Sequence, residues 1–184
     1  MPTTQLTYDS TISSNWDTDI ANIAADDGTM AGATSVGRIA IVAFTNLPAA
    51  AHTINSINYV LVDTIMNSPG KTDETRVVVT LQDSSGDFYA ENAEFVTRNY
   101  NRTGTSRTTS DGSTAWTLSQ INDIRLKLNV ASANPNIGAG IQLDYAYIEV
   151  DYNLAPIPTY PNTSHRIIMD GGNVILDRGT IILD

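Results

Sequence analysis

The clearest secondary-structure signal in the chain is the stretch Asp123-Ile124-Arg125-Leu126-Lys127-Leu128-Asn129-Val130. Every even-numbered residue in it is apolar, and every odd-numbered residue is polar or charged. Successive side chains of a β-strand point to opposite faces, so this alternation predicts a strand with one face on a core and the other in water. It indicates an antiparallel sheet, because such sheets commonly keep one face solvated.

Similar runs occur on both sides of that stretch. We predict further strands over residues 38–47, 53–66, 74–82, 88–96 and 140–152. Residues 38–47 are apolar on both faces, which suits a central strand buried on both sides, and Pro48 ends it. The turn Asp83-Ser84-Ser85-Gly86-Asp87 joins residues 74–82 to residues 88–96 as a β-hairpin.

The strand over residues 140–152 changes phase along its length. Ile141, Leu143 and Tyr145 share one face, and the apolar set then moves to the face of Ala146 and Ile148. A shift of one residue swaps the faces of a strand. We therefore predict a β-bulge near Asp144 and Tyr145, with Tyr145 facing the core.

The remaining segments are rich in polar and turn-forming residues. Residues 8–34 predict mostly loop, pinned by Trp16, with a possible helical turn over residues 19–25. Residues 97–115 predict an excursion loop or a weak edge strand, because they bury little apolar surface. Residues 117–122 carry Thr and Ser positions fit to cap a single helical turn.

Seven or eight short strands with little helix predict an all-β protein, an antiparallel jelly-roll β-sandwich of about eight strands with a short C-terminal β tail. A length of 184 residues suits one domain plus a tail. We assign residues 1–153 to the sandwich, with a loop-rich N-terminal segment over residues 1–34. A Pro-rich linker follows over residues 154–166, and the tail occupies residues 167–184.

Composition disfavours several classes of protein. Ten basic and twenty acidic residues give a formal charge of -10, which repels nucleic acid phosphates and anionic membranes, so neither is an expected partner. There is no cysteine, hence no disulfide and no Cys-ligated metal, and no cofactor is expected. The sequence has neither a signal-peptide pattern at its start nor an apolar run near the ~20 residues of a membrane span, so we expect a soluble chain.

Several short sequence elements follow one another along the chain in a characteristic order. They are Asn15-Trp16, Asn22, Asp27-Gly28, Ala33-Thr34, Asn46-Leu47-Pro48 ahead of Ile54-Asn55-Ser56-Ile57, Trp116-Thr117-Leu118-Ser119-Gln120-Ile121-Asn122, and Leu143-Asp144-Tyr145-Ala146-Tyr147-Ile148-Glu149-Val150-Asp151-Tyr152. This order, over about three quarters of the chain, resembles a jelly-roll β-sandwich family found in phage virion structural proteins, namely capsid decoration, tail-fibre and baseplate modules. That family typically has Asp-Leu-Trp-Gly before its Trp-Thr element, whereas residues 110–115 differ here. The resemblance implies a sandwich with a role in the virion.

The tail repeats a seven-residue unit. Each unit begins with three apolar residues followed by Asp, and the apolar residues are Ile167, Ile168, Met169, Val174, Ile175, Leu176, Ile181, Ile182 and Leu183. Strands this short do not bury two consecutive branched residues within one chain. They form either a small sheet folded back on the chain's own sandwich or an arm for oligomerisation or docking, for which a trimeric β-prism is our first expectation.

Catalytic patterns are weak throughout. His52 and His165 are the only histidines, and no Gly-x-Ser-x-Gly motif lies near either. We expect no enzyme and no metal site. The carboxylates considered and assigned to turns or to solvent are Asp26, Asp27, Asp83, Asp87, Asp144, Glu149 and Asp151.

We therefore expect a non-enzymatic phage virion structural protein, an oligomeric capsid decoration (cement) protein in the first instance. Its partners would be further copies of itself, with a trimer favoured, and the major capsid protein or other virion proteins. Its location would be the virion, at the capsid surface or in the tail. The alternatives are a tail-fibre or receptor-binding module, and a carbohydrate-binding β-sandwich that uses Tyr100 or Tyr89 to hold a glycan.

Overall fold

The computed structural model describes residues 2–49, 51–66, 76–94, 100–132, 141–156, 167–170 and 173–176. The strands are β1 (Thr3–Ser14), β2 (Ala31–Ala33), β3 (Ile39–Phe44), β4 (Ala51–Met66), β5 (Arg76–Gln82), β6 (Asp87–Glu94), β7 (Tyr100–Thr103), β8 (Arg125–Ser132), β9 (Ile141–Leu143), β10 (Tyr145–Leu154), β11 (Ile167–Asp170) and β12 (Asn173–Leu176). Two short helices accompany them, the 3-10 helix η1 (Ile20–Ile23) and the α-helix α1 (Leu118–Asn122).

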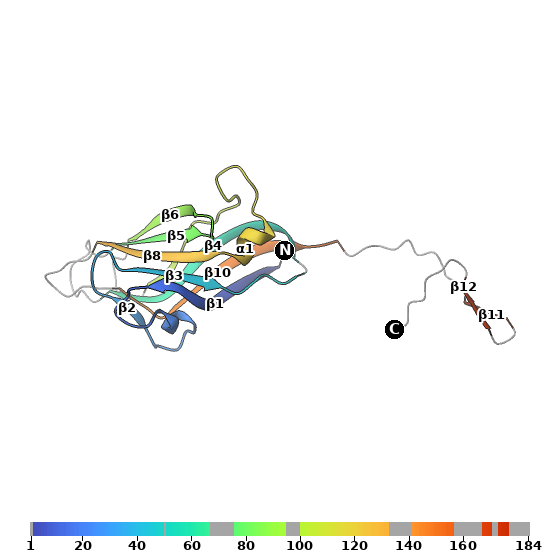
Figure 1. Ribbon diagram of the computed structural model, residues 1–184, viewed down its shortest axis with the longest axis horizontal. Helices are drawn as coiled ribbons and strands as arrows, with labels where there is room; N and C mark the ends of the chain where they lie inside the picture. The colour runs from blue at the N-terminus through green and yellow to red at the C-terminus, as the bar shows by residue number, and fades with distance from the viewer. Residues whose placement is uncertain are drawn as a thin grey trace.

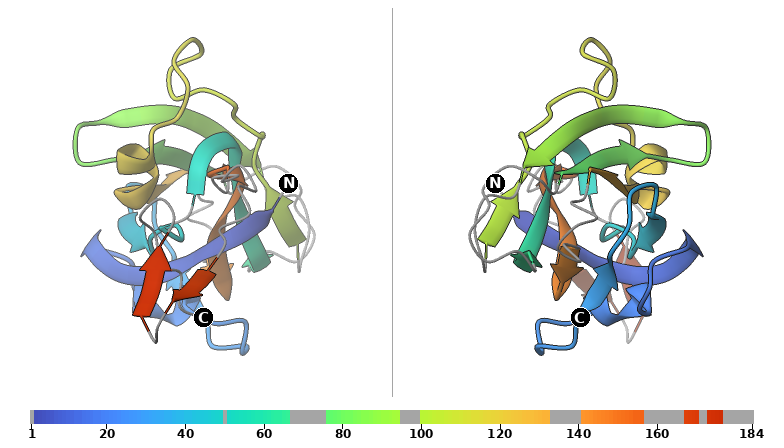
Figure 2. Two further views of the ribbon diagram at one scale, coloured as in Figure 1. Left: turned by 90° about the vertical axis from the view of Figure 1, so that its right-hand side faces the viewer. Right: turned by 90° about the vertical axis from the view of Figure 1, so that its left-hand side faces the viewer.

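Ten of the strands form one continuous antiparallel sheet that curls into two layers (Figures 1 and 2). Its order is β2-β9-β4-β10-β1-β3-β8-β5-β6, and β7 pairs with the other edge of β4. The fold is thus the antiparallel jelly-roll β-sandwich that the alternation predicts. Strands β11 and β12 form a separate two-stranded sheet.

Strand β1 belongs to both layers. Its residues 3–7 pair with β10, whereas residues 8–14 pair with β3. The first half therefore completes the layer of β7, β4 and β10, and the second half begins the layer of β3, β8, β5 and β6. One strand that crosses from layer to layer closes that side of the sandwich.

The inner faces of both layers share one hydrophobic core. Fully buried side chains include Tyr59 and Leu61 of β4, Leu126 and Leu128 of β8, and Ile148 of β10. Burying each of these side chains contributes about 1.5–3 kcal/mol. The sandwich therefore contains a core of its own.

Most of the predicted strands are confirmed. β4, β5, β6 and β8 lie within one to three residues of the expected positions, and β5 and β6 form the expected hairpin. β3 is central, between β1 and β8, as predicted. The prediction that this strand is buried on both faces was wrong, because Ile39, Ile41 and Ala43 on its outer face are half-buried.

The N-terminal segment differs most from the prediction. Residues 8–34 were expected to be mostly loop, but β1 continues to Ser14 and β2 follows it. Of the twelve residues of β1, Leu6 is the one that is buried, so backbone hydrogen bonds to its two neighbours hold the strand in place of an apolar face. Trp16 is buried as expected, and η1 occupies the expected helical turn.

The predicted phase change occurs at Asp144, which separates β9 from β10. Leu143 and Asp144 are both buried, and burial then alternates from Ala146 onward. The prediction that Tyr145 faces the core was wrong. Its ring is half-buried on the outer face, with its centroid 5.4 Å from that of Tyr147.

The two helices are short and locally determined. Thr117 caps α1 by accepting a hydrogen bond from the Gln120 amide, and the Gln120 side chain accepts one from the Thr117 amide, which is a capping box. Within the described residues, no helix is long and apolar enough to cross a membrane. Most of the expected linker, residues 157–166, lies outside the described residues.

Candidate functional site

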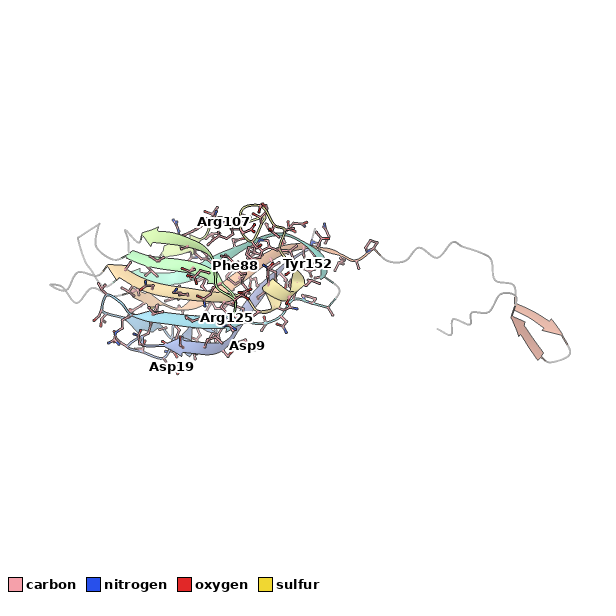
Figure 3. All side chains as sticks on the ribbon, turned by 45° about the horizontal axis from the view of Figure 1, so that its top comes forward. Asp9, Asp19, Phe88, Arg107, Arg125 and Tyr152 are labelled. Atoms are coloured by element: carbon pink, nitrogen blue, oxygen red, sulfur yellow. The ribbon has the colours of Figure 1, made fainter. Side chains whose placement is uncertain are left out.

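A pocket of about 260 Å³ opens beside β1, at the end of the sandwich that carries α1. Three segments line it: β1, the end of β3 with the loop after it, and the junction of α1 with β8. The side chains on which its chemistry rests are Asp9, Ile12, Asn46, Asn122 and Arg125, beside Phe44. Figure 3 labels Asp9 and Arg125 on this side of the sandwich.

Two β-bulges in β1 place the first of these side chains. The register between β1 and β3 shifts by one residue twice, and the two residues left over are Asp9 and Ile12. Both line the pocket, and Ile12 is 48% exposed. A bulge leaves its extra residue unpaired and turns its side chain in a new direction, so the irregular pairing of β1 builds this wall.

The opposite wall comes from the C-terminal end of α1. The Oδ1 atom of Asn122 accepts a hydrogen bond from the Leu47 amide at 3.0 Å, which ties the loop after β3 to the helix. This bond leaves the Nδ2 donors of Asn122 without a partner among the described residues. The capping box at Thr117 fixes where the helix begins and therefore where Asn122 lies.

The pocket holds one paired and one unpaired carboxylate. Asp123 Oδ1 lies 2.8 Å from Arg125 Nη2, and Asp123 Oδ2 accepts a hydrogen bond from the Ser84 amide at 2.8 Å. The hydrogen bonding with Ser84, followed by the Arg125 guanidinium, holds the pKa of Asp123 below its ordinary value. Asp9 accepts a hydrogen bond from the Ser10 hydroxyl at 3.1 Å, and no cation of the described residues pairs with it.

A second polar cluster bridges β4, β6 and the loop after β7. Glu91 accepts hydrogen bonds from the Tyr59 hydroxyl at 3.2 Å, the Thr105 amide at 3.1 Å and Arg107 Nη2 at 2.6 Å. Burial, and then the charge of Glu91, raises the pKa of Tyr59 to about 12. Every member of this cluster contacts another part of the protein, so we assign it to stability.

Tyr89, expected as an exposed aromatic for a glycan, is half-buried and packs against the core. The Arg107 guanidinium carbon lies 4.4 Å from the centroid of its ring, and the Trp116 ring lies 6.4 Å from it on centroids. Trp116 itself is buried against Phe88, so it anchors its turn to the core. The side chain of Tyr100 lies outside the described residues.

The carboxylates considered for catalysis or for a metal lie apart. Glu149 accepts a hydrogen bond from Asn58 and Asp151 one from Asn55, both on the outer face of β10, whereas Asp144 is buried. Among the residues that the structure describes, no three His, Cys, Asp or Glu side chains are grouped to hold a metal ion. The side chain of His52 and the whole of His165 lie outside the described residues.

The Asp side chains in the turns accept hydrogen bonds from nearby backbone amides. Asp83 accepts hydrogen bonds from the amides of Ser85 and Gly86, and Asp27 accepts one from the amide of Thr29. These are the contacts that turn chemistry predicts for Asp. Asp87 forms an ion pair with Lys127 at 3.3 Å.

Six of the nine apolar tail residues proposed for docking lie in β11 and β12. The antiparallel register pairs Ile167 with Leu176, Ile168 with Ile175, and Met169 with Val174. The remaining three, Ile181, Ile182 and Leu183, lie outside the described residues. Within the described part of the chain, β11 and β12 pair with each other and with no strand of the sandwich.

No protein-family model matches the chain. No curated protein matches it either. Among solved structures, it is similar to a truncated AlyQ with CBM32 and alginate lyase domains, at 12% sequence identity and a TM-score of 0.38 over 84% of this chain. The chain covers 35% of that protein's length, and similarity at this level indicates neither a shared family nor a shared activity.

Proposed function

We propose that this chain is a non-enzymatic structural protein of a phage virion, an oligomeric capsid decoration protein held in place by its C-terminal tail. The proposal rests chiefly on the hairpin of β11 and β12, which pairs outside the sandwich. Its two strands have four residues each, and a two-stranded hairpin is marginally stable in water at best.

The composition of the hairpin supports a partner. Each strand contains three consecutive apolar residues, and consecutive residues of a strand alternate between its faces. In the register of β11 and β12, one face carries Ile167, Met169, Val174 and Leu176, and the other carries Ile168 and Ile175 beside Asp170 and Asn173. Both faces therefore contain apolar residues, and covering these with other apolar surface is favourable. Copies of the same ribbon related by rotational symmetry supply that surface, and three copies are our first choice.

The positions of the start of β1 and the end of β10 support outward display of the sandwich. The Tyr152 amide donates a hydrogen bond to the Pro2 carbonyl at 3.2 Å, so the start of β1 and the end of β10 lie together. Figure 1 shows the N-terminus at the end of the sandwich where β10 ends. An attachment made there leaves the opposite end free to face outward.

Light scattering on the full chain and on a variant truncated after Leu154 tests the assembly. We expect the full chain to have the mass of an oligomer, and the truncated chain to be a monomer with an unchanged thermal unfolding transition of the sandwich. A monomeric full chain, or an oligomer that survives truncation, would overturn the role of the tail.

Gold-labelled antibodies on purified phage particles test the location. Label on the head supports a decoration protein. Label at the tail would replace that assignment with a tail-fibre or receptor-binding module, and particles without label would exclude a virion role.

A further inference from the structure

We propose that the pocket beside β1 binds a single sugar residue of a glycan, which is a function beyond attachment through the tail. The argument starts from the two bulges. Each one interrupts the pairing of β1 with β3, and the two extra residues, Asp9 and Ile12, line the same pocket. Bulges commonly re-aim side chains next to functional sites, and two that converge on one pocket indicate a built wall.

The polar groups of the pocket retain hydrogen-bonding capacity. Asp9 accepts a hydrogen bond from its neighbour Ser10, and a carboxylate has about four acceptor positions. Asn122 uses its oxygen and keeps two donors, while Arg125 uses Nη2 toward Asp123. A ligand in the pocket therefore meets both acceptors and donors.

The charges disfavour an anionic ligand. Asp123 pairs with Arg125, so the unpaired carboxylate of Asp9 leaves the pocket with a net negative charge, which repels an anion at short range. A neutral sugar is not repelled, and its hydroxyls both donate to a carboxylate and accept from an amide or a guanidinium.

The size and the apolar surface of the pocket agree with one ring. Its volume of about 260 Å³ is smaller than the roughly 300–1,000 Å³ of pockets that enclose drug-sized ligands. Ile12 offers an aliphatic surface that is 48% exposed, against which the C–H face of a ring packs. The mixture of one apolar wall with a few convergent polar groups is typical of small-molecule sites.

The test uses the full chain and a panel of free monosaccharides, namely glucose, galactose, mannose, rhamnose and N-acetylglucosamine. Saturation-transfer NMR titrations measure binding. We expect saturable binding of at least one sugar, weakened about tenfold or more in Asp9→Asn, because hydrogen bonds to an ionised acceptor are roughly twice as strong as those to a neutral one. Ile12→Ser should also weaken it, through loss of the aliphatic contact.

Two matched variants serve as controls. Asp87→Asn removes an exposed carboxylate outside the pocket, and Val36→Ser removes an exposed aliphatic side chain that is 57% accessible. Both should bind as the unaltered chain does, and circular dichroism of all four variants checks their folding. A trilysine peptide, measured in the same way, distinguishes a cationic ligand.

Three results would overturn the proposal. The first is the absence of saturable binding to every sugar of the panel. The second is sugar binding that survives both Asp9→Asn and Ile12→Ser in folded protein. The third is trilysine binding that depends on Asp9 and exceeds that of any sugar.

Discussion

The carboxylate of Asp144 accepts the backbone N–H of Gly28 through both of its oxygens, at 3.1 and 3.0 Å, across 116 residues of chain. Asp144 lies at the break between β9 and β10 and is 1% exposed, while Gly28 has a φ of 82° in an exposed turn. This contact fixes the loop after η1 to the point where the closing strand changes phase. It also explains why a charged residue occupies an inward position in that strand.

Replacing Asp144 should therefore destabilise the sandwich. Asp144→Ala leaves the Gly28 amide without its acceptor, and we expect a loss of about 1–3 kcal/mol in the free energy of unfolding, measured by urea denaturation. Asp27→Ala is the matched control, because Asp27 is exposed and serves its own turn, so a change within about 0.5 kcal/mol is expected. Equal losses in the two variants would contradict the role of the long-range contact.

Gly104 should tolerate no side chain. A Cβ atom added there would overlap the ring of Tyr59, which is 2% exposed in the core. We expect Gly104→Ala to lower the free energy of unfolding by about 1–3 kcal/mol through overpacking. The substitution Gly112→Ala meets nothing within 4 Å but has a φ of 89°, so it isolates backbone strain of about 1 kcal/mol. Thermal and urea unfolding of both variants should rank Gly104→Ala as the less stable.

Acid should weaken the fold in part through Glu91. Its burial alone would raise its pKa, but the hydrogen bonds from Thr105 and Arg107 outweigh burial and lower the pKa below 4.5. The unfolded chain then binds the proton more tightly, so this stabilisation is present above pH 4.5 and is lost as the pH falls through the folded pKa. Urea midpoints of Glu91→Gln should be lower at neutral pH and fall less steeply below pH 4.5 than those of the unaltered chain. An equally steep fall would show that other groups carry the acid sensitivity.

The strand that the sequence predicts best is β8, which alternates residue by residue between polar and apolar side chains. β5 shows the same period in Val77, Val79 and Leu81, and the turn over residues 83–87 then indicates β6 as its hairpin partner. β1 carries no such signal, because Leu6 is its one buried residue and two neighbouring strands hold it through the backbone. β1 forms because two neighbouring strands of the sheet pair with it, and the local pattern of apolar residues gives no sign of that pairing.

The sequence does not predict the pocket, for a related reason. Asp9 and Ile12 enter it as the extra residues of bulges, and a bulge is defined by the register with β3. The nearest sequence signal is the capping pattern at Thr117, which locates α1 and hence Asn122. Tyr145 was misplaced because an amphipathic aromatic suits either face, and the contact of Asp144 with Gly28 decides which face it takes.

A charge in the hairpin of β11 and β12 should prevent oligomerisation. Ile168 and Ile175 are directly paired in the register of β11 and β12, so a charge at either position enters the same part of the ribbon. If the ribbon is covered by other copies, Ile168→Asp and Ile175→Asp each bury a carboxylate without a partner, at a cost of several kcal/mol. Light scattering should then show a monomer, while the thermal transition of the sandwich stays unchanged. Val36→Asp adds the same charge at an exposed position and should leave the assembly intact. An oligomer that persists in both tail variants, or dissociates equally in Val36→Asp, would show that the contacts between copies lie on the sandwich.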